Sequence, residues 1–454
     1  MKVPLMNAQS LYPKAKAAPV LMFAALSAVA FHIQAAPTVS GAVLGEENST
    51  LTIVGTGFGQ KSQAAPILLD KLDTSHENGV VNSAYQILEH GNKVPTASES
   101  SFSIWAGGSS GAWGSVRPAV TSTHQPRHHE SKEHYFLQGH NSTLGNPVAH
   151  GGQTGWNTPI DDKQLYVSWW YKPKFPPQWY WRISPVSLTG EYIPGEALNI
   201  GGIAKATFIG IDSDGQLNLA FNEKPPTTKE LLGSTIVGVE SGAKSLFPDQ
   251  HISASSIGYE SPGSQKYIRV WEDPAGKEGI RFSWTQMHQT IGTTVNWAEA
   301  PLQGGKWNHL ELELDTQKGF ARLHVNSKKL TEFSFDPALD REGKWSPTVA
   351  LIGLEGKVGR LQESHLDDIY IDNTLQRVVL ANAKSINDAT HYEVQQPVKW
   401  DDQSITVNIH KGAIPDISAY YIFVFDDQGN PNKEGYPICG DCKLPPVKID
   451  LSIE

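Results

Sequence analysis

The clearest hydrophobic pattern of the chain is an alternation of leucines with polar residues over residues 307–315. After a short turn, a second alternating run covers residues 320–325. A period of two with one apolar face is typical of a half-buried β-strand. The two runs therefore predict a pair of adjacent strands.

Short runs of the same kind recur along most of the chain, separated by turns rich in glycine and proline. The chain has 454 residues, with 41 Gly, 29 Pro and only 19% charged residues, and no long helical period is present. A short helix is expected at residues 229–232. The predicted strands of the main domain cover residues 66–72, 165–171, 179–183, 207–211, 217–222, 266–272, 280–284, 307–315, 320–325, 349–354 and 366–372. The chain is therefore predicted to be all-β.

The run W-N-H-L-E-L-E-L-D, the turn T-Q-K-G and the run F-A-R-L-H-V-N-S-K-K-L resemble the back-sheet hairpin of concanavalin A-like and laminin-G-like sandwiches. The resemblance implies a turn at Asn326 and Ser327, in the place of the usual Asp-Gly or Asn-Gly. Residues 365–372 resemble the closing strand of many such jelly rolls. The resemblance implies a concanavalin A-like β-sandwich over residues 65–374. Because folds of this kind mostly bind sugars, it also implies a polysaccharide or glycan as partner.

Two flanking segments resemble immunoglobulin-like modules. Residues 37–59 look like the opening strands of an IPT/TIG module, and residues 400–429 are similar to the second half of an IPT or fibronectin-like module. The flanks are assigned to residues 36–64 and 375–454, and the two halves are hypothesised to complete one another around the lectin-like domain. This arrangement resembles that of exported bacterial proteins.

Residues 1–35 have the pattern of a secretory signal peptide. Three lysines precede an apolar run at residues 19–31, and Ala35 is a small residue at the expected cleavage site. The apolar run is shorter than the roughly 20 residues that a membrane-spanning helix needs. We therefore expect a secreted or periplasmic protein that is not inserted in a membrane.

The charge of the chain argues against a nucleic-acid partner. The chain has 37 Lys and Arg residues against 47 Asp and Glu residues, a formal net charge of −10. The predicted signal peptide contains three of the lysines and no acid, so its removal makes the net charge −13. An acidic protein lacks the attraction to phosphates that nucleic-acid binding requires, although one local basic patch could still attract an anionic ligand.

The only two cysteines, Cys439 and Cys442, are separated by two residues. In an exported protein this spacing favours a local intramolecular disulfide. A thioredoxin-like role would require a βαβ context, and haem c attachment normally requires histidine where Lys443 stands. A zinc site would need two further ligands from elsewhere.

Three acids, Glu311, Glu313 and Asp315, share one face of the strand predicted at residues 307–315. They are the nearest match to the paired carboxylates of laminarinase-type glycosidases, but their order differs. We interpret them as a solvated strand face. A polysaccharide lyase of this fold would use Tyr or His as base and Arg, Gln or Asn beside the sugar carboxylate, but the short strand motifs of the alginate-lyase members are missing.

The sequence predicts no metal site, although calcium is left open. Six histidines share one polar stretch without a zinc-ligand spacing and are interpreted as a surface loop: His124, His128, His129, His134, His140 and His150. Asp212 and Asp214 match part of a calcium loop but lack its distal glutamate, and a hairpin turn explains them. No other cofactor is predicted.

Aromatic residues are the preferred candidates for ligand binding, because sugars stack their C–H faces on such rings. The predicted ligand-binding residues are Trp169, Tyr171, Trp179, Trp181, Trp271, Trp284 and Trp297. The alternative for each is a place in a tryptophan-rich core. The leading hypothesis is an exported, lectin-like carbohydrate-binding protein without evident catalysis. The alternatives are a polysaccharide lyase or glycoside hydrolase of the same fold, and a structural surface or matrix protein.

Overall fold

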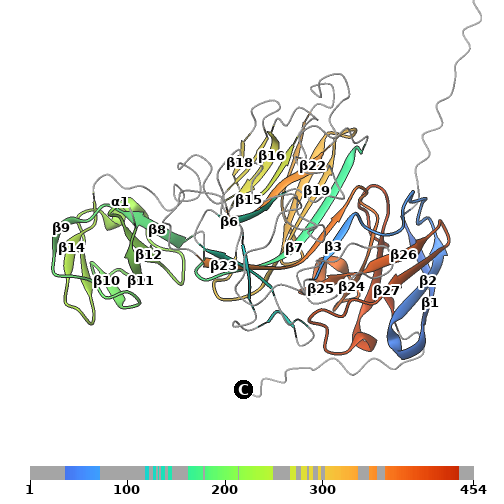
Figure 1. The fold of residues 1–454 in the computed structure, drawn as a ribbon, viewed down its shortest axis with the longest axis horizontal. Helices are drawn as coiled ribbons and strands as arrows, with labels where there is room; N and C mark the ends of the chain where they lie inside the picture. The colour runs from blue at the N-terminus through green and yellow to red at the C-terminus, as the bar shows by residue number, and fades with distance from the viewer. Residues whose placement is uncertain are drawn as a thin grey trace, which may run out of the picture. The chain divides into compact units, whose positions relative to one another are not determined.

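The computed structural model describes most of the chain beyond residue 35. The described residues are 36–71, 118–121, 126–128, 131, 134–138, 142–145, 162–176, 179–212, 214–248, 266–271, 278–283, 286–289, 295–297, 302–335, 347–354 and 363–438. Among them every strand pairing is antiparallel (Figure 1). The prediction of an all-β protein is confirmed.

An eight-stranded sheet and a six-stranded sheet form the central sandwich. The eight-stranded sheet has the order β21 (Lys328–Ser334), β20 (Phe320–Val325), β19 (Asn308–Asp315), β7 (Gln164–Pro173), β23 (Glu363–Asp372), β5 (His134–Gln138) and β4 (Ala119–Thr121), and β3 (Leu68–Asp70) also pairs with β23. The six-stranded sheet has the order β18 (Val295–Trp297), β17 (Gln286–Gln289), β16 (Glu278–Ser283), β15 (Lys266–Trp271), β22 (Thr348–Leu354) and β6 (Ser142–Gly145). Buried side chains from both sheets belong to one hydrophobic cluster.

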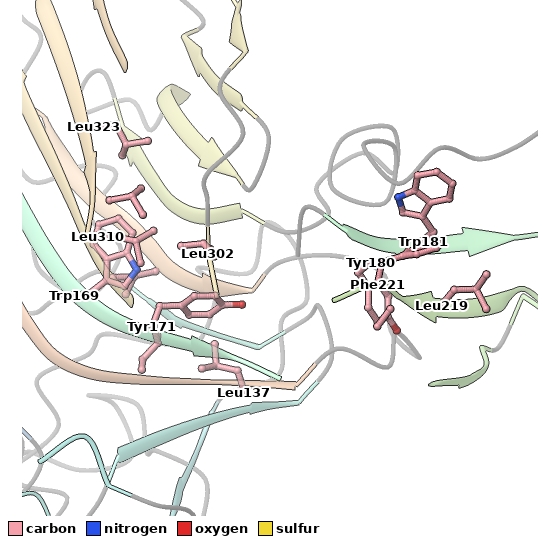
Figure 2. Packing of buried hydrophobic residues seen from close by; sticks show 14 of the residues in the cluster. Leu137, Trp169, Tyr171, Tyr180, Trp181, Leu219, Phe221, Leu302, Leu310 and Leu323 are labelled. Carbon is pink, nitrogen blue, oxygen red and sulfur yellow. The ribbon is translucent and has the colours of Figure 1, made fainter. Parts of the chain in front are cut away.

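The hairpin predicted from the leucine alternation is present. Leu310, Leu312 and Leu314 of β19 are fully buried in the core together with Trp169 of β7. Figure 2 shows Leu310 and Trp169 in this core. The connection from β20 to β21 runs through Asn326 and Ser327, whose φ angles of 50° and 64° are those of a type I′ turn. The alternation thus predicted the pairing, and the resemblance to known hairpins predicted the turn that follows it.

Residues 180–246 form a seven-stranded sheet of their own. Its order is β8 (Tyr180–Ile183), β12 (Leu217–Ala220), β11 (Ala204–Ile211), β10 (Ala197–Ile200), β13 (Thr235–Gly238), β14 (Lys244–Leu246) and β9 (Val186–Thr189). The helix α1 (Thr228–Leu231) begins with a capping box between Thr227 and Glu230, which confirms the predicted short helix. Asp212 accepts hydrogen bonds from the backbone of Asp214 and Gln216 in the β11–β12 turn, as the hairpin interpretation required.

The two ends of the described chain meet in a second sandwich, here called the terminal sandwich. One of its sheets has the order β1 (Thr38–Leu44), β2 (Thr50–Thr56), β27 (Ser404–Asn408) and β26 (Gln396–Trp400). The other has the order β25 (Tyr392–Val394), β24 (Arg377–Ala381), β28 (Tyr421–Phe425) and β29 (Tyr436–Pro437). Short 3-10 helices lie at η1 (Glu46–Asn48), η8 (Ile386–Asp388) and η9 (Ile417–Ala419).

The pairing of β2 with β27 joins segments from opposite ends of the sequence, in register from Thr50 with Asn408 to Val54 with Ser404. Side chains of both sheets, among them Ile53 and Val424, form one buried cluster. This agrees with the hypothesis that the two flanks complete one another. The domain boundaries themselves stay predictions.

Among the described residues, no helix has the length and apolar character that a membrane span requires.

Candidate functional site

The acids of β19 lie under the terminal sandwich. Strand alternation places Glu311, Glu313 and Asp315 opposite the leucines, and each of the three is only 1% exposed. The interpretation of these acids as a solvated face is wrong. The reason is that residues of β24, β25 and β28 pack against this face and form a third apolar cluster with Tyr166 and Phe320 of the eight-stranded sheet.

Glu311 is the centre of a buried group of tyrosines and histidines. Its carboxylate accepts hydrogen bonds from the hydroxyl groups of Tyr166, at 2.6 Å, and Tyr392. The Nδ1 atoms of His309 and His324 both lie 3.8 Å from its Oε2. Burial alone would raise the pKa of Glu311, but the histidines, Arg377 and the tyrosine hydrogen bond outweigh it and hold the pKa at about 2.

Glu313 is held by two arginines. The Nη2 atom of Arg377 donates to its Oε1 at 2.6 Å, and the Nη1 atom of Arg322 donates to its Oε2 at 3.4 Å. The guanidinium of Arg377 also lies over the rings of Tyr166 and Phe425, at 4.3 Å and 3.8 Å from their centroids. Burial by itself would lower the pKa of Arg377, but Glu313 and the neighbouring acidic groups raise it above its usual value. The guanidinium of Arg377 therefore stays charged.

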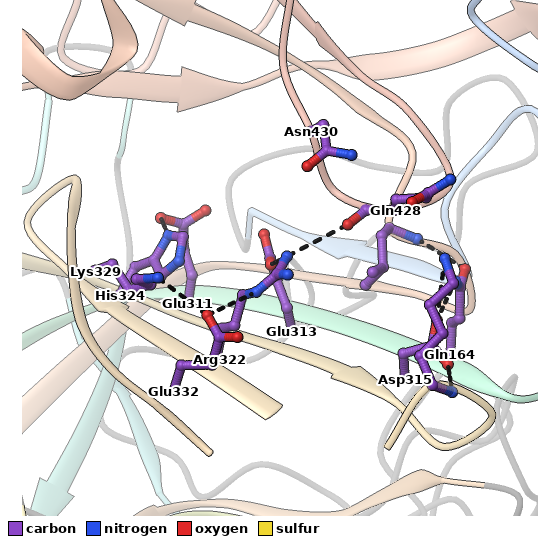
Figure 3. A network of polar contacts seen from close by, with 12 residues as sticks. Gln164, Glu311, Glu313, Asp315, Arg322, His324, Lys329, Glu332, Gln428 and Asn430 are labelled. Carbon is purple, nitrogen blue, oxygen red and sulfur yellow. Dashed lines mark hydrogen bonds and ion pairs between the residues drawn. The ribbon is translucent and has the colours of Figure 1, made fainter. Parts of the chain in front are cut away.

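Beside this pair a cleft of about 390 Å³ opens between the β20–β21 hairpin and the terminal sandwich; we call it the interface cleft. Figure 3 shows Arg322, His324, Lys329 and Glu332 on the hairpin side and Asn430 on the facing loop. The residues that line it are Glu313, Arg322, His324, Ser327, Lys329, Glu332, Arg377, Ile386, Asn387, Tyr392, Phe425, Gly429, Asn430 and Pro431.

The facing loop is fixed by a turn around Asp426. Its Oδ1 atom accepts hydrogen bonds from the backbone of Gln428, at 2.9 Å, and Asn430, at 2.8 Å. Gly429 within the turn has a φ of 76°, a conformation that glycine adopts without strain. The carbonyl of Gln428 in turn accepts from Nη1 of Arg322 at 3.3 Å, so the loop and the hairpin are tied together at the base of the cleft.

A second buried polar cluster surrounds Arg127. Its guanidinium donates to Asp368 and, at 2.7 Å, to Glu393, and it lies 4.5 Å above the ring of Trp170. Asp368 has a φ of 44° at a register shift between β23 and β7. The pKa of Asp368 is well below its usual value, because Arg127 and His410 outweigh the effect of burial, which would raise it.

Asp368 could also contribute to a metal site, since His128, Asp368 and His410 each offer one ligand atom and these atoms lie within 4.8 Å of one another. However, Arg127 donates to Asp368 Oδ2, and its Nη2 lies 3.3 Å from His410 Nε2. A divalent cation would have to be placed against this fixed positive charge. The donor set therefore fits a buried ion-pair network better than a metal site.

The predicted aromatic residues lie mostly in the core. Trp169 and Tyr171 are fully buried and Trp181 is 7% exposed (Figure 2). Trp179 is partly buried against the same cluster. Ligand binding by these residues stays a prediction, and their burial agrees with the alternative of a tryptophan-rich core. Trp271 and Trp297 end the strands β15 and β18, whose side chains are not described. Trp284, Cys439 and Cys442 lie outside the described residues.

The residues of the interface cleft were not predicted as a site. Arg322 and His324 could have been found, because the β19–β20 hairpin pairs them with Glu313 and Glu311. The opposite wall, with Asn387 and Asn430, comes from the terminal sandwich, and the sequence carries no signal that it packs there.

The comparisons with known proteins give no family. No family model and no curated protein matches the chain. Among solved structures the chain is similar to arcelin-5, a lectin-like defense protein from Phaseolus vulgaris, with 7% identity and a TM-score of 0.21 over 62% of this chain and 90% of that chain. It is also similar to a SAP-like pentraxin from Limulus polyphemus, with 9% identity and a TM-score of 0.19 over 56% of this chain and 86% of that one.

A sialidase from Trypanosoma rangeli matches with 11% identity and a TM-score of 0.24, over 56% of this chain and 27% of the sialidase. The chain spans 27%, 13% and 43% of the first three matched structures, less than half of each. At these TM-scores the similarities carry no argument about function.

Proposed function

We propose that this chain is an exported, lectin-like carbohydrate-binding protein and that the interface cleft is its glycan site. The observation that carries the proposal is the cluster of Arg322, Lys329 and Glu332 at the cleft, with side chains 24%, 56% and 33% exposed. A carboxylate beside a guanidinium and an ammonium offers an acceptor and several donors within a short distance. Neighbouring hydroxyl groups of a sugar, which both donate and accept, require this combination.

The size of the cleft supports the proposal. Ligand sites for small molecules usually enclose about 300–1,000 Å³, and the interface cleft of about 390 Å³ lies at the lower end of this range. Two amide residues, Asn387 and Asn430, add further hydrogen-bonding groups on the opposite wall. A site of this size would hold one or two sugar residues, such as the end of a glycan chain or a short part of a polysaccharide.

The titratable groups around the cleft favour binding over proton abstraction. Burial, and then the charge of Glu311, raise the pKa of Tyr392 well above its usual value, so its hydroxyl keeps the proton that a catalytic base would have to lose. Both carboxylate oxygens of Glu313 accept from arginines. These groups act as fixed partners of one another, and this supports the non-catalytic hypothesis over the lyase and the glycosidase.

Export is part of the proposal because of the signal-peptide pattern in residues 1–35. N-terminal sequencing of the protein secreted or released to the periplasm should give Ala36 as the first residue. Retention of residues 1–35 in a membrane fraction would contradict this part.

The site can be tested by screening the purified protein on a glycan array and repeating each positive in solution by calorimetry. We expect Arg322→Ala to weaken binding at least tenfold. Lys174→Ala is the matched control, because Lys174 is an exposed lysine paired with Glu363 and is not among the cleft residues. Thermal melts of both variants would separate lost binding from lost folding.

Two outcomes would contradict the proposal. One is a wild-type protein that binds no glycan on the array, and the other is an Arg322→Ala variant that binds as tightly as the wild type. Assays for new reducing ends and for unsaturated products should be run on every bound polysaccharide, and turnover in either assay would favour the enzyme alternative.

A further inference from the structure

We infer that the interface cleft selects glycans that carry a carboxylate, as uronic and sialic acids do, and that Arg322 and Lys329 bind this group. The inference rests on the proposed function and narrows its ligand class. It comes from the distribution of charge in the cleft. The fixed charges that line it are the cations of Arg322, Lys329 and Arg377 and the carboxylates of Glu313 and Glu332, so positive charge is in excess by one.

The guanidinium of Arg377 is occupied by hydrogen bonds within the protein. Its Nη2 atom binds Glu313 at 2.6 Å, its Nη1 atom donates to the carbonyl of Leu375 at 2.9 Å, and its side chain is 1% exposed. It therefore balances Glu313 from inside the structure. The cations that a ligand can reach are those of Arg322 and Lys329.

The guanidinium of Arg322 has N–H donors that a ligand could use. Its Nε atom binds Glu332 at 3.1 Å, and its Nη1 atom binds Glu313 and the carbonyl of Gln428. Its Nη2 atom has no hydrogen-bond partner within the part of the chain that the structure describes. Because guanidinium groups bind carboxylates through pairs of N–H donors, this atom is suited to an acceptor supplied by the ligand.

Lys329 is held beside Arg322 by a shared partner. Its Nζ atom donates to Oε2 of Glu332 at 3.0 Å, and the same oxygen accepts from Nε of Arg322 at 3.1 Å. Two of the three N–H donors of the ammonium remain for a ligand. Glu332 thus positions the two cations next to each other, so that one carboxylate could accept hydrogen bonds from both.

The preference for an anion is local to the cleft. The whole chain carries a formal net charge of −10, and such a charge repels acidic polysaccharides at long range. A carboxylated sugar would therefore bind through the two cations of the hairpin, and not through a general attraction of the protein for anions. The sugar hydroxyl groups would use Glu332, Asn387 and Asn430, which line the same cleft.

The experiment compares matched pairs of oligosaccharides by calorimetry on the full chain. In one pair, glucuronate oligosaccharides are compared with glucose oligosaccharides of the same linkage; in the other, sialyllactose is compared with lactose. We expect the carboxylated member of at least one pair to bind about tenfold tighter or more. Charged hydrogen bonds are weakened by salt, so this ratio should fall as the salt concentration rises from 50 to 500 mM.

The variants Arg322→Gln and Lys329→Gln should each reduce the ratio, and together they should bring it close to one while the neutral sugar still binds. Lys174→Gln removes one positive charge outside the cleft and should leave the ratio unchanged. Neutral sugars that bind as tightly as their carboxylated partners in both pairs would overturn this inference and leave the proposed function standing. A ratio that survives in the double variant would overturn it as well. The absence of binding by all four ligands would overturn the inference, and an array on which no glycan is bound would overturn the proposed function too.

Discussion

Arg377 of β24 donates to Glu313 of β19 across 2.6 Å, and both side chains are buried. The pair joins the terminal sandwich to the outer face of the eight-stranded sheet. A charge in such a place needs its partner, because neither group can be solvated by water once the two surfaces have met. Both residues also line the interface cleft, so the stability of the interface and the shape of the site depend on the same residues.

Arg377→Met should destabilise the protein by about 3–5 kcal/mol, because it leaves Glu313 as a buried charge without its main partner. The double variant Arg377→Met with Glu313→Leu removes both charges and should lose less than the sum of the two single variants. Urea unfolding followed by tryptophan fluorescence would measure both effects. Strict additivity would show that the two residues do not act as a pair.

Much of the central sandwich could be predicted, because long strands show a clear alternation of apolar and polar residues in the sequence. β20 was predicted at its observed bounds, and the β19 prediction began one residue early. Strands of three or four residues, such as β14 (Lys244–Leu246) and β9 (Val186–Thr189), are too short to show a period. Their alternation cannot be told from that of a loop, and so the seven-stranded sheet as a unit was not foreseen.

Only the hairpin side of the candidate site could be predicted from the sequence. The hairpin register already places Arg322 beside Glu313. The burial of Glu311, however, depends on Tyr392, which lies 81 residues further along the chain. An alternation of leucines with acids is the same whether water or another sheet covers the acids, and this is why the solvated-face interpretation failed.

Lowering the pH should reduce the free energy of unfolding, and part of this loss should come from Glu311. Its pKa is about 2 in the folded chain against a usual value of 4.5. A lowered pKa contributes stability that is complete above the usual value and is lost as the pH falls toward the folded one. The contribution is on the order of 3 kcal/mol, and it should disappear between about pH 5 and pH 2.

Glu311→Gln cannot lose this contribution, so its stability should fall less steeply over the same range than that of the wild type. Urea midpoints measured at intervals between pH 5 and pH 3 would give the two slopes. Equal slopes would mean that the carboxylate titrates in the folded protein as it does in the unfolded chain.

Trp169→Ala should cost about 3–5 kcal/mol of stability, as expected for a large side chain removed from a packed core. Trp169 is fully buried beside Leu310 and Leu312. A ring that served mainly as a sugar platform would behave differently, with weaker glycan binding and little change in the thermal melt. Melts and calorimetry on the same variant therefore decide between core and ligand-binding roles for this residue.

Gly429 lies at the wall of the interface cleft. Its φ is 76°, and a Cβ atom at this position would lie 3.2 Å from Oε2 of Glu313. Alanine in the left-handed region costs about 1–2 kcal/mol by itself. Glu313 is held by two arginines and cannot easily move away, so Gly429→Ala should cost more than the backbone term alone.

Gly215 provides the control. It has a φ of 74° in the turn between β11 and β12, and an added Cβ would meet no atom within 4 Å among the described residues. Gly215→Ala should therefore show the backbone cost alone, and the difference between the two variants measures the contact with Glu313. Because relief of the close contact would shift the loop that lines the cleft, Gly429→Ala should also weaken glycan binding, whereas Gly215→Ala should not. Equal losses of stability and unchanged binding in both variants would contradict the close packing of the loop against Glu313.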